Sequence, residues 1–213
     1  MLIMEERLKT GTTTVGIVCK DGIVLAADKR ATAGTMIVDK RADKVHVISD
    51  DFAVTIAGTV SDAQLIIKLI RAELKLKEVR THKGPTTKEA ANLLGGLLYS
   101  SIRQMSMIPG IAHFLLGGKD KEGTHLYDLF PDGSVTKIRD YVSSGSGSVF
   151  AYGVLETHYK EGMTTAEATK LAVLSVNTAL HRDSASGNGV DVIVVSDKDI
   201  KRVMHKEVET SLL

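Results

Sequence analysis

Two kinds of apolar pattern alternate in blocks along this chain. One is a short continuous apolar run, and the other is a longer segment in which apolar residues recur every three or four positions, as on one face of a helix. Runs rich in β-branched residues, bounded by Gly, Asp and Ser, indicate strands joined by tight turns. The predicted strands cover residues 13–19, 23–27, 45–48, 52–57, 112–116, 124–130, 134–138, 190–195 and 200–204. The predicted helices cover residues 61–79, 86–102, 149–159 and 165–180. The order is strands, two helices, strands, two helices, strands.

Three of these helices begin with a capping-box pattern, a Ser or Thr followed three positions later by Glu or Gln. The pairs are Ser61 with Gln64, Thr86 with Glu89, and Thr164 with Glu167. In the first helix, Leu65, Leu69 and Ala72 recur along one face, which predicts that this face is buried.

The block order predicts the fold class. Strands clustered in runs favour antiparallel sheets over repeated βαβ units. Two such sheets with a helix pair over each outer face would bury every apolar stripe, so we expect an α+β protein. No linker, low-complexity tract or internal repeat interrupts the pattern. We therefore expect one domain.

Composition narrows the classes of partner. The chain has 213 residues, 43% hydrophobic and 25% charged, enough for a sizeable core. A net charge of +1 argues against nucleic acid or an anionic membrane as partner. No apolar run approaches the roughly 20 residues of a membrane helix. The lone Cys19, in an apolar strand, fits a reducing compartment and a buried small side chain. Residues 1–11 are too short and too charged for a signal peptide and are expected to form a leader.

Thr12 is the first candidate for chemistry. If the chain is cut between Gly11 and Thr12, one residue carries a hydroxyl nucleophile and a free α-amine. That amine has an unperturbed pKa of about 7.7–8.0, so it can accept a proton near neutral pH. The alternative is that the β-branched run Thr12 to Thr14 simply opens an edge strand.

Asp28 and Lys44 are candidates to activate that hydroxyl. Asp28 ends an apolar run, so it could instead be a turn residue at a strand end. Lys44 ends a charged stretch, so it could instead be a solvated surface charge. As a pair, Asp28 would hold Lys44 near Thr12, where a cation favours the alkoxide. Gly58, at a strand end, could aim its N–H at a developing oxyanion or serve only as a turn glycine.

Other polar segments fit known motifs poorly. The small-residue run 143–148 and the segment 117–119 match neither a dinucleotide fingerprint nor a P-loop. The polar run 181–187 lacks a G-x-S-x-G elbow. The histidines show no paired metal-ligand spacing, so no metal and no cofactor are expected.

Taken in order, these segments resemble the proteasome β-subunit signature. The matching segments are Thr12-Thr13-Thr14-Val15-Gly16, Asp28, Lys44, 58–62, 145–147, 149–156 and 182–187. Each segment is weak alone, but the order and spacing are specific. The similarity runs from about residue 11 to residue 195, and the Thr-Thr-Thr start with a short leader looks most like an archaeal β-subunit.

The resemblance implies a fold and a set of roles. The family fold is the Ntn-hydrolase fold, a four-layer α-β-β-α sandwich, and the activity is that of a threonine-type endopeptidase. By position, Thr12 would be nucleophile and, through its amine, base. Asp28 and Lys44 would activate it, and Gly58 would donate to the oxyanion. A supporting hydrogen-bond network would comprise Ser146, Asp183 and Ser186.

Substrate and maturation follow from the same resemblance. Backbone groups of Thr32 and Val60 would hold the peptide as an added strand. The main specificity pocket would be lined by Ala31, His46, Ile56 and Val60. An apolar-leaning pocket favours cleavage after hydrophobic residues, with His46 as the polar exception. Residues 1–11 would be a propeptide that Thr12 removes by attack on the Gly11 carbonyl, leaving residues 12–213 as the catalytic domain.

The family also implies partners. Its β-subunits form seven-membered rings stacked between rings of α-subunits, with the sites facing a closed chamber in the cytoplasm. An ATP-dependent unfoldase would feed unfolded polypeptides to the particle, and neither nucleic acid nor membrane would take part.

Three alternatives stay open at this point. One is the bacterial relative with six-membered rings, which shares the Thr-Thr start and the lysine. Another is a non-catalytic ring subunit, although such subunits typically lose the threonine or the lysine. The third is an amidotransferase-type N-terminal hydrolase, which the absence of a cysteine at the processing site disfavours.

Overall fold

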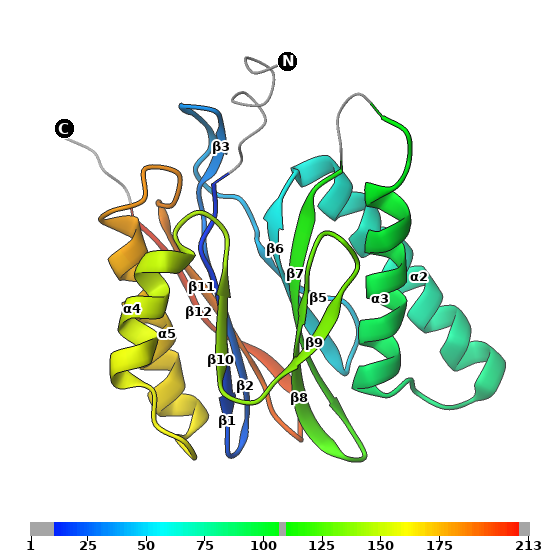
Figure 1. Ribbon diagram of the computed structural model, residues 1–213. Coiled ribbons are helices and arrows are strands. Elements are labelled where there is room, and N and C mark those ends of the chain that lie inside the picture. The colour runs from blue at the N-terminus through cyan, green and yellow to red at the C-terminus, as the bar shows by residue number, and fades with distance from the viewer. Residues whose placement is uncertain (1–10, 107–109, 209–213) are drawn as a thin grey trace.

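The computed structural model describes residues 11–106 and 110–208. Two five-stranded antiparallel sheets lie face to face, and a pair of helices covers the outer side of each (Figure 1). One sheet has the order β10-β1-β2-β11-β12 and the other β5-β6-β7-β8-β9. A small two-stranded hairpin, β3-β4, follows β2 in the chain and projects at the top of Figure 1. The four-layer α-β-β-α sandwich predicted from the sequence is confirmed.

The elements have these bounds. The strands are β1 Thr14–Cys19, β2 Gly22–Asp28, β3 Ala31–Ala33, β4 Met36–Asp39, β5 Val45–Val47, β6 Phe52–Gly58, β7 Ala112–Asp120, β8 Gly123–Leu129, β9 Val135–Ile138, β10 Tyr141–Ser144, β11 Gly189–Val195 and β12 Ile200–Glu207. The helices are α2 Val60–Thr81, α3 Thr87–Ile102, α4 Ser148–His158 and α5 Thr165–Leu180.

Side-chain alternation along the strands builds three apolar layers. In β2, Val24 and Ala26 face α4 and α5, whereas Ile23 and Leu25 enter the core between the two sheets. All four side chains are fully buried. Because successive residues of a strand point to opposite faces, a strand covered on both sides is apolar throughout. The third layer lies between the β5–β9 sheet and helices α2 and α3.

The helix starts agree with the sequence in two cases of three. Thr86 and Thr164 each form a complete capping box with the Glu three residues later. The predicted box at Ser61 is wrong: α2 begins at Val60 after Thr59, and no side chain caps it.

The predicted buried face of α2 is also wrong. Leu65 and Leu69 are 56% and 42% exposed, and Ala72 is exposed as well. The residues that face the core are Ala63, Ile66, Ile67, Ile70 and Leu74. Since α2 is apolar on both sides, its periodicity alone could not decide which side packs on the sheet.

Some strands were not predicted. No apolar pattern marks the short strands β3 and β4, and the small-residue run 143–148 predicts a loop. Ser143 and Ser144 instead belong to β10, which pairs with β1. Residues 117–119 lie within β7, so they form no phosphate-binding loop.

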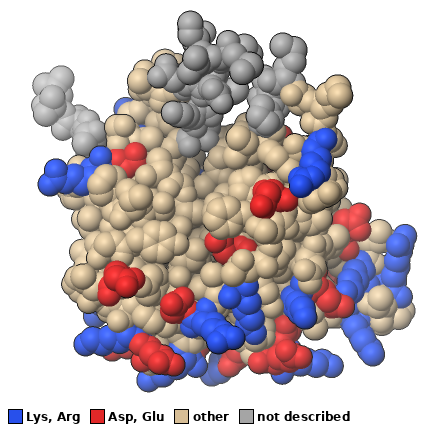
Figure 2. All heavy atoms as spheres, in the orientation of Figure 1, with Lys and Arg blue, Asp and Glu red and all other residues tan. Residues whose placement is uncertain are grey.

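The surface bears its charges unevenly. Figure 2 shows Lys, Arg, Asp and Glu side chains gathered along the lower and right margins of the visible face, with a largely uncharged centre. Among the described residues, no helix is long and apolar enough to cross a membrane.

Candidate active site

The candidate site forms where β1 begins. Thr12 lies two residues before β1, a strand held between β10 and β2, and it is only 3% exposed. The Asp28 N–H at the end of β2 donates to the Thr13 carbonyl (3.1 Å). The β1–β2 ladder thus fixes the residues next to Thr12 against Asp28.

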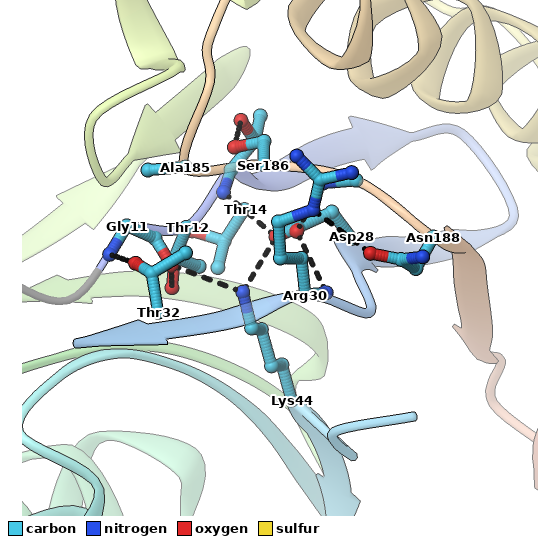
Figure 3. A network of polar contacts seen from close by, with 12 residues as sticks. Gly11, Thr12, Thr14, Asp28, Arg30, Thr32, Lys44, Ala185, Ser186 and Asn188 are labelled. Atoms are coloured by element: carbon cyan, nitrogen blue, oxygen red, sulfur yellow. Dashed lines mark hydrogen bonds and ion pairs between the residues drawn. The ribbon is translucent and has the colours of Figure 1, made fainter. Parts of the chain in front are cut away.

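Asp28 is a fully buried carboxylate with four donors around it. Oδ1 accepts from the Lys44 ammonium (2.8 Å) and the Thr13 N–H (3.0 Å). Oδ2 accepts from the N–H groups of Arg30 (3.0 Å) and Gly187 (2.9 Å). Because a buried charge needs both a counter-charge and hydrogen bonds, this set of donors explains how an ionised Asp28 is tolerated. The predicted pairing of Asp28 with Lys44 is present in the geometry (Figure 3).

Lys44 is buried as deeply as its partner, with 5% of the residue exposed. Burial lowers the pKa of the Lys44 ammonium below its ordinary value, and the Asp28 carboxylate opposes that shift without cancelling it. A lysine in this condition gives up its proton more readily than a surface lysine.

The Gly11 carbonyl oxygen lies at the centre of the site. The Thr12 hydroxyl donates to it at 2.6 Å and the Lys44 ammonium at 3.2 Å. Figure 3 shows Lys44 reaching from below toward both Asp28 and the Gly11–Thr12 link. A hydroxyl and an amine therefore converge on the one peptide carbonyl that precedes Thr12.

Two serines connect this centre to Asp183. The Thr12 N–H donates to Ser146 Oγ (3.2 Å), and Ser146 in turn donates to Asp183 Oδ2 (2.6 Å). Ser186 donates to the same oxygen (2.6 Å) and lies 2.7 Å from the Thr13 hydroxyl. The fold thus brings together the three residues that the sequence named as a supporting network.

Gly58 lies at the end of β6, beside the Lys44 segment, because the Ile56 N–H donates to the Lys44 carbonyl (2.9 Å). Its φ is +109°, and an added Cβ would lie 2.2 Å from the Ile111 carbonyl oxygen. Only glycine fits such a position. Its role as oxyanion donor stays a prediction.

The predicted pocket residues are spread over β3, β5, β6 and the start of α2. Ala31 is buried in β3, and Ile56 packs in the layer beneath α2 and α3. Val60 is 43% exposed. His46 is partly buried, its Nε2 has no hydrogen-bond partner among the described residues, and burial lowers its pKa. That these four residues form the specificity pocket stays a prediction.

The sequence missed several groups that shape the site. Arg30 Nε donates to Asn188 Oδ1 (2.8 Å), and its Nη1 donates to the Ser184 carbonyl (2.9 Å), so it braces the loop before β11. The Thr32 hydroxyl accepts from the Gly11 N–H (3.0 Å), whereas the resemblance assigns a role only to backbone groups of Thr32. The motif 182–187 is the one signal in the sequence for this region, and it does not indicate that Arg30 contacts Ser184.

Within residues 11–106 and 110–208, one group of side chains has metal-ligand spacing. Oxygen and nitrogen atoms of Asp43, Asp191 and His205 lie within 4.8 Å of one another. However, the Lys29 ammonium is 3.3 Å from Asp191, and Arg202 Nη1 is 3.8 Å from both carboxylates. Two cations already neutralise the pair, so this group acts as an ion-pair cluster that joins β11 and β12 to the segments after β2 and before β5.

The fold and the site together define a class. A two-sheet α-β-β-α sandwich with a threonine hydroxyl at the start of a central strand, beside a buried Lys–Asp pair, is an Ntn hydrolase. The family model described as "Proteasome subunit" matches residues 8–195, and the chain belongs to that family.

Its relatives narrow the assignment. The chain is 42% identical to proteasome subunit beta of Ferroglobus placidus over 99% of its length and 98% of the relative. Identity to the Archaeoglobus fulgidus subunit is also 42%, covering 100% and 98%. For Methanocaldococcus jannaschii it is 41%, covering 95% and 89%. The chain is accordingly a threonine-type endopeptidase of the proteasome core particle.

Proposed function

We propose that Thr12 is the nucleophile of this endopeptidase and that the same hydroxyl first removes residues 1–11. The observation that carries the proposal is the geometry at the Gly11 carbonyl. Its oxygen accepts hydrogen bonds from both the Thr12 hydroxyl (2.6 Å) and the Lys44 amine (3.2 Å). A nucleophile and a polarising donor on one carbonyl are what acyl transfer requires.

Self-cleavage begins with Lys44 because the Thr12 nitrogen is then an amide and has no basicity. Neutral Lys44, favoured by its lowered pKa, takes the hydroxyl proton as Thr12 Oγ attacks the Gly11 carbonyl carbon. The resulting ammonium faces the oxygen on which negative charge develops. The C–N bond then breaks as the Lys44 ammonium passes that proton to the departing nitrogen, and Gly11 is held as an ester on Thr12. Water hydrolyses that ester and releases the leader.

Peptide cleavage then uses the new terminus. The freed amine of Thr12 accepts the hydroxyl proton, through a water, as Oγ attacks a substrate carbonyl. Ser146, Asp183 and Ser186 orient the amine, which fits the 3.2 Å contact of the Thr12 nitrogen with Ser146 Oγ. In this second reaction Lys44 acts in its charged form, held beside Asp28, and stabilises the alkoxide. The Gly58 N–H donates a hydrogen bond to the oxyanion.

Substrate binding follows the added-strand mode. Backbone groups of Thr32 and Val60 hold the peptide, and the pocket residues accept the side chain before the cut bond. The pocket is lined by Ala31, His46, Ile56 and Val60. The buried, unpartnered Nε2 of His46 is its polar member.

The chain assembles with α- and β-subunits in the core particle. Its surface supports extensive contacts, because large apolar side chains are exposed on the outer helices. They are Leu65, Leu69, Leu76 and Val79 on α2, and Val149 and Tyr152 on α4. We further propose seven-membered β-rings between α-rings, in the cytoplasm, fed with unfolded polypeptides by an ATP-dependent unfoldase.

The test is the intact mass of the chain after co-expression and assembly with its α-subunit. The parent and Thr12→Ser should both show the mass of residues 12–213, because each keeps a hydroxyl at position 12. Thr12→Ala should keep the leader and lose peptidase activity while still assembling. A leader retained by the parent chain would favour the non-catalytic ring subunit. Loss of the leader from Thr12→Ala would show that another protease makes the cut.

A further inference from the structure

Gly11 is enclosed on three sides. Its N–H donates to the Thr32 hydroxyl (3.0 Å), and its carbonyl oxygen contacts Thr12 and Lys44. On the third side stands Ala185: a Cβ added to Gly11 would lie 1.7 Å from the Ala185 Cβ. Figure 3 shows Thr32 and Ala185 on either side of the Gly11–Thr12 link.

Both walls of this enclosure are held firmly. Thr32 is 4% exposed and pairs with Ile37 in the β3–β4 hairpin. The Ala185 N–H donates to Asp183 Oδ1 (3.2 Å), and the carbonyl of Ser184 before it accepts from Arg30. The Ala185 methyl therefore cannot swing aside without breaking the Asp183 loop.

From this geometry we propose that Thr32 and Ala185 form a glycine-selective slot that positions the Gly11–Thr12 bond for self-cleavage. The inference rests on the self-cleavage proposed above and adds the residues that choose the bond. Thr32 is a positioning residue: its hydroxyl satisfies the buried N–H of Gly11 and so fixes the orientation of the peptide plane. Ala185 is a specificity residue, because its methyl makes the closest contact with any side chain at position 11 and its backbone the next closest.

The steric argument has a clear size. Non-bonded carbon atoms pack at about 3.5–4.0 Å, so a side chain at position 11 would require a shift of more than about 1 Å. Such a shift moves the carbonyl away from the Thr12 hydroxyl and the Lys44 amine. A misplacement of about 1 Å can cost about 100-fold in rate.

The slot also explains how an endopeptidase can accept side chains in substrates that it cannot accept in its own leader. A substrate peptide is not covalently joined to Thr12, so its residue before the cut bond is free to direct its side chain elsewhere. Gly11 has no such freedom, because its carbonyl carbon is bonded to the Thr12 nitrogen.

The experiment measures leader removal over time by intact mass, in particles assembled with the α-subunit. Gly11→Ala should slow removal by about 100-fold. Adding Ala185→Gly to it should restore a measurable part of that loss, because the 1.7 Å contact is removed. Recovery is expected to be partial, because the Cα and C atoms of residue 185 would still lie 2.8 Å and 2.9 Å from the new Cβ. Ala185→Gly alone should process at the parental rate.

Thr32 is tested with a matched pair. Thr32→Val keeps the shape of the side chain and loses the hydroxyl that accepts from the Gly11 N–H, so leader removal should slow about tenfold. Thr32→Ser keeps the hydroxyl and should remove the leader at close to the parental rate. Equal rates for these two variants would overturn the role of Thr32. Parental processing of Gly11→Ala, no gain from adding Ala185→Gly, or slow processing by Ala185→Gly alone would overturn the slot.

A second preparation separates the slot from self-cleavage itself. A chain whose Thr12 is freed by an added protease site in place of the leader should cleave peptides equally well with Ala185 or Gly at 185. A fall in that turnover would place Ala185 in the peptidase site and overturn its assignment to the slot. A parent chain that keeps its leader would instead refute the proposed self-cleavage, and the slot with it.

Discussion

Replacing Asp28 with Asn tests the central electrostatic feature of the site. The change keeps the size of the side chain and removes its charge. Asp28 accepts four hydrogen bonds, two on each oxygen. An amide has one oxygen, so its NH2 group must face two N–H donors in either orientation. Lys44 also loses its counter-charge while only 5% exposed.

The expected loss of stability is about 3 kcal/mol, more than a hundredfold in the folding equilibrium. Removing one partner of a buried ion pair costs about 3–5 kcal/mol, because the other charge stays buried and unpaired. We expect the lower end of that range. Burial already lowers the pKa of Lys44, so the lysine can escape part of the cost by losing its proton.

Urea unfolding followed by circular dichroism measures this effect. The reference chain, the Asp28→Asn variant and the control should all carry Thr12→Ala, so that none of them loses its leader during the experiment. Asp197→Asn is the matched control, because Asp197 is exposed and its loss should change stability by no more than about 0.5 kcal/mol. A loss below about 1 kcal/mol in the Asp28 variant, or a loss equal to the control's, would refute the argument.

Three further predictions follow from other elements. Burial raises the pKa of the Cys19 thiol to about 12, so iodoacetamide at pH 8 should label the protein only in denaturant; labelling of native protein would contradict this. Thr86→Ala and Thr164→Ala should each lower the free energy of unfolding by about 1 kcal/mol, whereas Ser61→Ala should be nearly neutral. If Ser61→Ala lost as much stability in urea titrations as the two cap variants, the capping hydrogen bonds would not be the cause of the loss. Because burial lowers the pKa of Lys44, its neutral fraction grows as pH rises, and leader removal should accelerate with pH and level off below 10.5. A rate that falls as pH rises would mean that the charged form is required.

Much of the fold could be predicted from apolar patterning. β2 and β11 are apolar on both faces because helices cover one side and a second sheet covers the other, and such runs are visible in the sequence. The helix α5 was predicted with its observed bounds, since its capping box marks its start. The three-residue strand β3 and the serine-containing β10 carry too few apolar positions to give a signal.

The candidate site divides in the same way. The sequence supplied Thr12, Asp28 and Lys44 through motif spacing, and the fold brings these three together at Gly11. It did not supply Thr32 or Ala185 as neighbours of Gly11, because neither has a distinctive residue type or position.

By itself, then, the sequence indicated the candidate residues Thr12, Asp28 and Lys44 and most of the strands and helices, because both depend on residue type and local period. Only the tertiary structure decided which face of α2 packs inward and which side chains enclose Gly11. The physical reason is the same in both cases. An apolar face or a methyl group acquires its role from what lies opposite it, and that neighbour comes from a distant part of the chain.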